Sequence, residues 1–238
     1  MKIDIQKAKE AFKEYVKNYD QEDKQVKLKI EHIERVSQLA RNMAEKLKLS
    51  EEDIALAELI GLLHDIGRFE QIRIYHTFND KKSINHGEFG AKVLFENDLI
   101  RKFIETDEFD EIIKLAIVNH NRDKIEEGLT ERQLLHAKLI RDADKTDIFY
   151  LLITGEEKTL WETDNMNGEI VTNEIYREFI EDKNIKYKNR ETSGDLLVAH
   201  FAYIYDLYFK PSLKIFKKET KIAIKENGRI IDITEDLK

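Results

Sequence analysis

The sequence has 238 residues, enough to bury one substantial core or two unequal ones. Its 40 basic and 48 acidic residues give a formal net charge of −8, which excludes a broad basic surface for nucleic acid. The absence of cysteine excludes disulfides and thiolate metal sites. The N-terminus lacks the apolar core of a signal peptide, and no run of about 18 apolar residues occurs, which favours a cytoplasmic protein with no membrane partner.

A nearly all-helical fold is expected, because the chain has one proline and apolar residues recur three and four positions apart. The first helix is expected near residues 3–18 and the second near residues 23–47. On the second helix, His32 shares a face with Val36 and Met43 and therefore points where the aliphatic side chains point. Taken alone, such a histidine is more often a buried core residue than a metal ligand.

The third helix is expected to be the central buried one. Ser50 and Asp53 resemble a capping box at its start, and apolar residues then cover most of its circumference. It ends in the adjacent pair His64-Asp65, followed by Gly67 as a natural stop. A buried carboxylate needs a partner or a cation, and imidazole with carboxylate is a ligand set for divalent transition metals. We therefore interpret this pair as the centre of a metal site.

Two further histidines lie near expected helix ends. Residues 69–82 are expected to form an irregular loop, in which His76 is a candidate for contacting substrate; a solvated connection is an equally good interpretation. The next helix is expected over residues 83–97, with His86 in its first turn. A short helix over residues 108–120 ends with His120.

A long helix that ends near residue 153 is expected to begin at a capping box made by Thr130 and Gln133. Asp144 lies on its apolar stripe and is therefore an acid on the buried side. Asp142 and Asp147 lie at other angles, and we expect them to be solvated or to support the metal ligands from behind.

The last third of the chain is expected to be a helical extension. Residues 154–168 are polar and predict a linker or surface loop, and helices are expected near 171–183, 194–209 and 211–224. The aromatic residues of the middle helix are more typical of a core than of a base-stacking surface. Residues 229–234 alternate as a strand does and are compatible with a short terminal β-hairpin formed with residues 221–224.

Three parts of the chain are predicted. Residues 1–22 would form an N-terminal helix that packs on the core, residues 23–153 the metal-binding domain, and residues 154–238 the extension that packs on that domain. The oligomeric state is not readable from the sequence.

Six side chains share one property, since each lies on an apolar face or at a helix end aimed inward. They are His32, His64, Asp65, His86, His120 and Asp144. Bundle cores commonly hold such ligands on facing helices, and six of them would suit two metals bridged by one carboxylate. His136 and His200 lack comparable partners in the sequence and are expected to be structural.

The order His…His-Asp…Asp resembles the HD superfamily of metal-dependent phosphohydrolases. Residues 32–36 are similar to its first motif, residues 63–67 to its signature and residues 142–145 to its last motif, so the resemblance covers roughly residues 23–152. It implies a helical HD-domain bundle in which the first metal is held by His32, His64, Asp65 and Asp144, with Asp65 as the bridge. His86 and His120 match the two extra histidines of the binuclear branches.

Two departures from the family pattern bear on chemistry. The only proline is Pro211, so the Gly-Tyr-Pro element of the cyclic-dinucleotide branch is absent. Arg68 stands where some mononuclear nucleotidases carry a glutamate that acts as acid or base. A guanidinium stays protonated, so the nucleophile would be activated by the metals, with Asp65 and Arg68 as the catalytic residues. We expect Arg68 to clamp phosphate and Lys145 to add a second positive charge; a solvated Lys145 is an equally good interpretation.

The sequence therefore predicts a metal-dependent phosphohydrolase that uses one or two divalent ions to hydrolyse a small phosphate ester or anhydride, with a nucleotide as the leading candidate. The ligands suit manganese, iron, cobalt, nickel, zinc or magnesium and do not distinguish among them. Two alternatives stay open. One is a di-iron oxygenase, because some relatives with the same six ligands resemble mixed-valent di-iron oxygenases. The other is a module that senses a nucleotide without turning it over.

Overall fold

The computed structural model describes residues 2–96, 98–154, 170–182 and 185–227. Most of these residues are helical and none of them lies in a strand, which confirms the all-α prediction. The described α-helices are α1 (Ile5–Val16), α2 (Lys24–Lys46), α3 (Glu51–Leu63), α4 (Gly67–Tyr75), α5 (His86–Phe95), α6 (Asp110–Asn119), α7 (Glu131–Thr154), α9 (Asn173–Arg177), α10 (Ser193–Ala202) and α11 (Lys210–Asn227).

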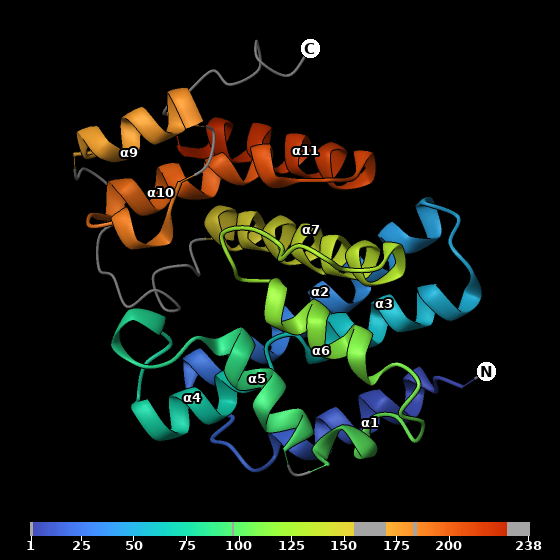
Figure 1. Ribbon diagram of the computed structural model, residues 1–238. Helices are drawn as coiled ribbons and strands as arrows, with labels where there is room; N and C mark the ends of the chain where they lie inside the picture. The colour runs from blue at the N-terminus through green and yellow to red at the C-terminus, as the bar shows by residue number, and fades with distance from the viewer. Residues whose placement is uncertain (1, 97, 155–169, 183–184, 228–238) are drawn as a thin grey trace.

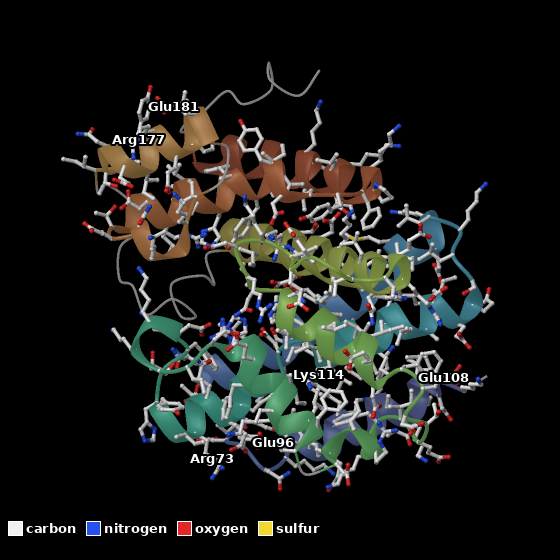
Figure 2. All side chains as sticks on the ribbon, viewed as in Figure 1. Arg73, Glu96, Glu108, Lys114, Arg177 and Glu181 are labelled. Carbon is white, nitrogen blue, oxygen red and sulfur yellow. The ribbon has the colours of Figure 1, made fainter. Side chains whose placement is uncertain are left out.

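Shorter helical turns connect these elements. They are the 3₁₀ turns η1 (Asp80–Lys82), η2 (Leu99–Lys102), η4 (Tyr187–Asn189) and η5 (Tyr203–Asp206), and the π-helical turn η3 (Glu178–Asp182). None of the described helices combines the length and the apolar composition that a bilayer span requires. Charged side chains such as Arg73, Glu96 and Arg177 project outward from the periphery of the bundle (Figure 2).

Helix α3 is the centre of the hydrophobic core, as its sequence predicts. Ser50 is its N-cap, where the Ser50 hydroxyl accepts from the Asp53 backbone N–H at 3.1 Å. Every residue from Ile54 to Leu63 is buried, and the helix packs against α1, α2, α6 and α7. Since buried side chains of α1 belong to the same hydrophobic cluster, the N-terminal helix contributes to the core that holds α3 in place.

Two glycines allow the helices around the end of α3 to approach closely. A Cβ on Gly61 would lie 2.7 Å from the Cα of Ser37 on α2. A Cβ on Gly67 would lie 2.6 Å from the backbone nitrogen of Gly90 on α5. Real Cβ atoms do not come that close to backbone, so a glycine is required at both positions. These contacts bring α3 against α2 and the start of α4 against α5.

The structure differs from the expectation for residues 69–82. Gly67 begins α4 instead of ending the chain's helical run, and residues 69–75 are helical. The cause is tertiary, because the fully buried Phe69 ring packs against the rings of Phe12, Tyr15 and Tyr19. The irregular stretch is therefore short and includes residues 76–79.

Helix α7 separates two layers of the molecule (Figure 1). Helices α2, α3 and α6 lie on one side of it, while α10 and α11 lie on the other. The capping box at its start is present, since the Thr130 N–H donates to the Gln133 side chain and the Gln133 N–H donates to the Thr130 hydroxyl. Residues 221–224, expected in a hairpin strand, belong to α11, so that part of the prediction is wrong, and residues 229–234 lie outside the described residues.

Asp142 of α7 binds the segment that leads into α11 and so holds the layer of α10 and α11 against α7. Its carboxylate accepts from the backbone N–H groups of Tyr208 (3.0 Å) and Phe209 (2.9 Å) and from the Ser212 hydroxyl (2.6 Å). Two of these donors precede α11, where backbone N–H groups lack helical acceptors. Asp142 is fully buried, so the expectation that it is solvated is wrong. Burial raises the pKa of Asp142 to about 6 despite these hydrogen bonds.

We expect Asp142→Ala to destabilise the protein by about 2–3 kcal/mol, because three donors would be left buried without their acceptor. Denaturant unfolding followed by circular dichroism measures this. Glu131→Ala, on an exposed residue of the same helix, is the control and should change stability by no more than about 0.5 kcal/mol. Equal effects of the two substitutions would contradict the role of Asp142.

An ion-pair cluster joins the starts of α3 and α7. Asp53 accepts from the Arg132 guanidinium at 2.7 Å and lies 3.0 Å from the Nε2 of the buried His136. Burial alone would raise the pKa of Asp53, but hydrogen bonds from Ser50, His136 and Arg132 lower it to about 2. His136 thus lies in a structural cluster away from the His64-Asp65 pair.

The low pKa of Asp53 predicts a pH-dependent contribution to stability. The ionised form is favoured in the folded state, so the contribution is present above the unfolded pKa of about 3.9 and is lost as the pH falls towards 2. Asp53→Asn should therefore lower the melting temperature at pH 7, and the difference from wild type should shrink between about pH 4 and pH 2. Thermal melts across this range measure it, and a difference that is constant with pH would contradict the assignment.

Candidate metal centre

Two of the six candidate ligands are C-cap residues. His64 ends α3 and His120 ends α6, and both are buried. The last carbonyls of a helix lack N–H partners, so a histidine three residues further on can donate to one of them. His64 Nδ1 donates to the Gly61 carbonyl at 2.8 Å, and His120 Nδ1 donates to the Ile117 carbonyl at 2.6 Å. This local bond fixes each ring and turns its Nε2 inward.

The other two histidines donate to carboxylates. His32 Nδ1 lies 2.7 Å from Oδ2 of Asp147, and His86 Nδ1 lies 2.5 Å from Oδ2 of Asp80. Arg35 holds Asp147 with two hydrogen bonds, and Arg68 holds Asp80. A carbonyl or an ionised carboxylate can only accept, so in all four histidines Nδ1 carries a proton and Nε2 is the atom left to face a metal. Partners of this kind orient histidine ligands in metal sites.

The four Nε2 atoms meet at Asp65. Its Oδ2 lies 3.6 Å from His32 Nε2 and 3.5 Å from His64 Nε2. Oδ1 of Asp144 lies 3.2 Å and 3.7 Å from the same two nitrogens. The other oxygen of Asp65, Oδ1, lies 3.5 Å from His86 Nε2 and 3.7 Å from His120 Nε2. The six ligand candidates thus form two sets that share the Asp65 carboxylate.

These donor atoms fit divalent metals. Atoms that each lie about 2.1 Å from one ion are about 3.0–3.4 Å apart, close to the separations seen here. His64 Nε2 and Asp65 Oδ1 are buried and have no hydrogen-bond partner among the described residues. His86 Nε2 and His120 Nε2 lie 3.0 Å apart although both hold lone pairs. A cation between such atoms would satisfy them.

The protonation states of His64, His86 and Asp65 favour metal binding, whereas that of His32 does not. Burial lowers the pKa of His86 to about 4, and burial likewise lowers the pKa of His64. Burial would raise the pKa of Asp65, but Lys29 and His64 outweigh it and hold that pKa well below its usual range. Burial and Lys29 would lower the pKa of His32, but hydrogen bonds with Asp144, Asp147 and Asp65 raise it to about 10. At His32, therefore, a metal would replace a proton.

Lys29 is a buried residue of the site that the sequence interpretation missed. Its Nζ donates to Oδ2 of Asp65 at 2.8 Å. It precedes His32 by three residues, which places both side chains on one face of α2. That spacing was the available signal, but a single lysine on a highly charged helix does not stand out.

Arg68 and Lys145 lie in the site but already have partners. Arg68 Nη1 donates to the Phe78 carbonyl (2.6 Å) and to Asp80 (2.8 Å), so Arg68 braces the acid that orients His86. Lys145 is buried and pairs with Asp206 of η5. The interpretation of Lys145 as a solvated residue is therefore wrong.

His76 lies outside the site. It is the C-cap of α4 with a left-handed φ of 55°, its side chain is exposed, and it does not line the cavity beside the metal ligands. The expectation that it contacts substrate is not supported, because its backbone position at the helix end directs it to solvent. Asp147, by contrast, is buried behind His32, which matches the supporting position that was one of its two expected roles.

A cavity of about 470 Å³ opens onto the candidate metal ligands. One side is formed by α2, α7 and the segment around Asp80, and the other by residues 185–206 of the C-terminal extension. Its lining includes Lys29, Asp65, Arg68, Asp144, Lys145 and Asp206. The volume lies within the range of about 300–1,000 Å³ that is usual for small-molecule sites.

A helical bundle with imidazole and carboxylate donors gathered in its core defines a metal-binding helical domain. A family model described as HD domain matches residues 30–148, which is half of the chain and contains all six candidate ligands. The chain therefore belongs to the HD domain family. The family consists mostly of hydrolases, and membership supports an enzyme with metal-dependent phosphohydrolase activity in general. No curated protein and no solved structure matches the chain.

The acid behind His86 should control metal affinity. We expect Asp80→Asn to weaken metal binding about 10- to 100-fold, because it removes the carboxylate that orients His86. Titration with Mn²⁺ followed by calorimetry measures the affinity. Asp123→Asn removes an exposed carboxylate at the same cavity and is the matched control, for which no more than a twofold change is expected. A wild-type affinity in Asp80→Asn would refute this role.

Proposed function

We propose that this protein is a phosphohydrolase that holds two divalent metal ions on the shared carboxylate of Asp65. The observation that carries the proposal is that the two oxygens of Asp65 face different sets of candidate ligands. Oδ2 faces His32, His64 and Asp144, while Oδ1 faces His86 and His120. A carboxylate whose oxygens face separate ligand sets suits a pair of metals about 3.5–4 Å apart.

When bound, the metals would lower the pKa of water to about 7 and neutralise charge on a phosphoryl group. The protein's own groups have three tasks in this proposal. The six ligands hold the ions, and Asp80 and Asp147 fix the orientation of His86 and His32. Lys29, which faces Asp65 at the cavity, would donate to a phosphate oxygen once the ions share its present partner.

Hydrolysis consumes one water molecule. Its oxygen forms a bond to phosphorus, and the bond from phosphorus to the leaving oxygen breaks. One of the water protons ends on the leaving oxygen and the other stays with the phosphate product or passes to solvent. Arg68 remains protonated throughout and keeps Asp80 in position.

The substrate in this proposal is a small phosphorylated molecule, with a nucleotide as the leading candidate. The cavity has the volume of a small-molecule site, and apolar side chains such as Ile148, Leu196 and Tyr203 line it beside the charged groups. A phosphoryl group would lie against the ligands and the remainder of the molecule against the apolar lining. A cytoplasmic location belongs to the same proposal.

Metal content and phosphate release test the proposal together. Wild-type protein loaded with Mn²⁺ should contain two ions per chain and release phosphate from a panel of phosphate esters and anhydrides. Asp65→Ala should lose both ions and at least a thousandfold in rate, whereas His86→Ala should keep one ion. His76→Ala is the matched histidine control, because His76 is exposed and outside the cavity. One ion per wild-type chain, or two in Asp65→Ala, would overturn the shared-carboxylate arrangement.

The same six donors suit iron, so a di-iron oxygenase is the second candidate. Oxygen consumption by iron-loaded protein, compared with phosphate release by manganese-loaded protein, separates the two. A nucleotide sensor would instead show a raised melting temperature with nucleotide and no phosphate release. Lys29 beside Asp65 favours an anionic substrate and therefore the hydrolase.

A further inference from the structure

The C-terminal extension lies outside the region that matches the HD family model, yet it supplies one wall of the cavity. Most of the residues that it contributes are apolar or aromatic. They are Ile185, Leu196, Ala199, Ala202 and Tyr203. The extension also contributes one carboxylate, that of Asp206 at the end of η5. A family-wide reaction would use the metal ligands, so this wall is where the chain can impose its own selectivity.

Asp206 is held firmly between two cations of α7. Its Oδ2 accepts from Arg141 Nη2 at 2.5 Å and from Lys145 Nζ, and its Oδ1 accepts from the Tyr208 hydroxyl at 2.9 Å. Arg141 is almost completely buried and also donates to the carbonyls of Asn119 and Arg122. Asp206 therefore takes up the charge of Lys145, the cation that follows the metal ligand Asp144 in the sequence.

The other cations that line the cavity are also engaged. Arg68 donates to Asp80, Arg122 pairs with Glu88 and Glu126, and Arg190 donates to the Ile185 carbonyl. Lys29 differs, because its acidic partner is Asp65, which the metals would share; the Nε of Arg68 also lies 3.6 Å from that carboxylate. The charges next to the ligands thus provide for one phosphoryl group, held by the ions and Lys29. A second phosphate further along the cavity would find Arg141 and Lys145 already paired with Asp206, beside an apolar wall.

We propose that the C-terminal extension restricts the site to phosphate monoesters with an uncharged aromatic or heterocyclic leaving group, and that Asp206 is the residue that discriminates against di- and triphosphates. The inference rests on the proposed phosphohydrolase and narrows its substrate class. Asp206 acts by withholding Lys145 from a second phosphate. The leaving group would lie against Tyr203 and the aliphatic residues beside it.

The test compares one nucleoside as its mono-, di- and triphosphate, each assayed with metal-loaded protein. Wild type should have a kcat/KM for the monophosphate at least tenfold above that for the diphosphate. Asp206→Asn should shrink this ratio at least tenfold, mainly by lowering KM for the diphosphate, because Lys145 becomes available. In the double variant Asp206→Asn/Lys145→Met, the KM for the diphosphate should return towards the wild-type value.

A binding measurement gives a readout that does not depend on turnover. Calorimetry with inorganic phosphate and with pyrophosphate, both in saturating Mg²⁺, should show at least tenfold tighter pyrophosphate binding in Asp206→Asn than in wild type, with phosphate binding unchanged. Asp195→Asn is the matched control, because Asp195 caps α10 through the backbone of Thr172, Glu191 and Thr192 and does not line the cavity. The Asp195→Asn variant should destabilise the extension without changing the kcat/KM ratio or the ratio of pyrophosphate to phosphate affinity.

The outcomes separate the inference from the proposed function. Metal-dependent hydrolysis that favours diphosphates in wild type, or ratios that Asp206→Asn leaves unchanged, would overturn the inference and keep the hydrolase. Absence of phosphate release from every substrate, with the calorimetric shift intact, would overturn the hydrolase and keep the selectivity. If Asp195→Asn changed the kcat/KM ratio and the binding ratio as much as Asp206→Asn does, Asp206 would act only through the stability of the extension. That result would also overturn the inference.

Discussion

The burial of the Asp65 carboxylate is the constraint on which this structure depends. Its side chain is 4% exposed and is surrounded by four imidazoles, one ammonium and one guanidinium. A charge removed from water is tolerated only where its surroundings replace the lost hydration. Candidate ligands from the ends of α3 and α6, the start of α5 and the middles of α2 and α7 converge there. The bundle is therefore arranged so that these groups compensate the buried charge of Asp65.

The fold class and the ligand set were accessible from the sequence because both rest on local patterns. Helical periodicity placed His32 and Asp144 on apolar stripes, and helix ends placed His64 and His120. The structure brings all six candidates together around Asp65. The groups that orient them were less accessible. Asp147 follows Asp144 by three residues, and Lys29 precedes His32 by three, a spacing that places both members of each pair on one helix face. In a chain with 37% charged residues, however, such pairs occur often.

The remaining errors arose where distant parts of the chain decide a residue's surroundings. Asp142 lies on another face of α7 from Asp144, as expected, but that face is covered by residues 208–212 and not by water. Helix α4 forms because Phe69 packs against α1, although its own sequence lacks an amphipathic pattern. Asp80 supports His86 only because Arg68 and Gln71 hold it from the preceding helix. The contacts of Asp142, Phe69 and Asp80 cannot be predicted from the sequence near each residue.

The two-sided role of α7 has a consequence for how the chain can be divided. Asp144 of this helix is one of the candidate metal ligands, while Arg141 and Asp142 bind groups of residues 206–212. A cut that isolated the family-matched segment would leave Arg141 without its carboxylate partner and Asp142 without its three donors. The cavity would lose a wall at the same moment. The family-matched segment therefore depends on the extension, which covers Asp142 and forms one wall of the cavity.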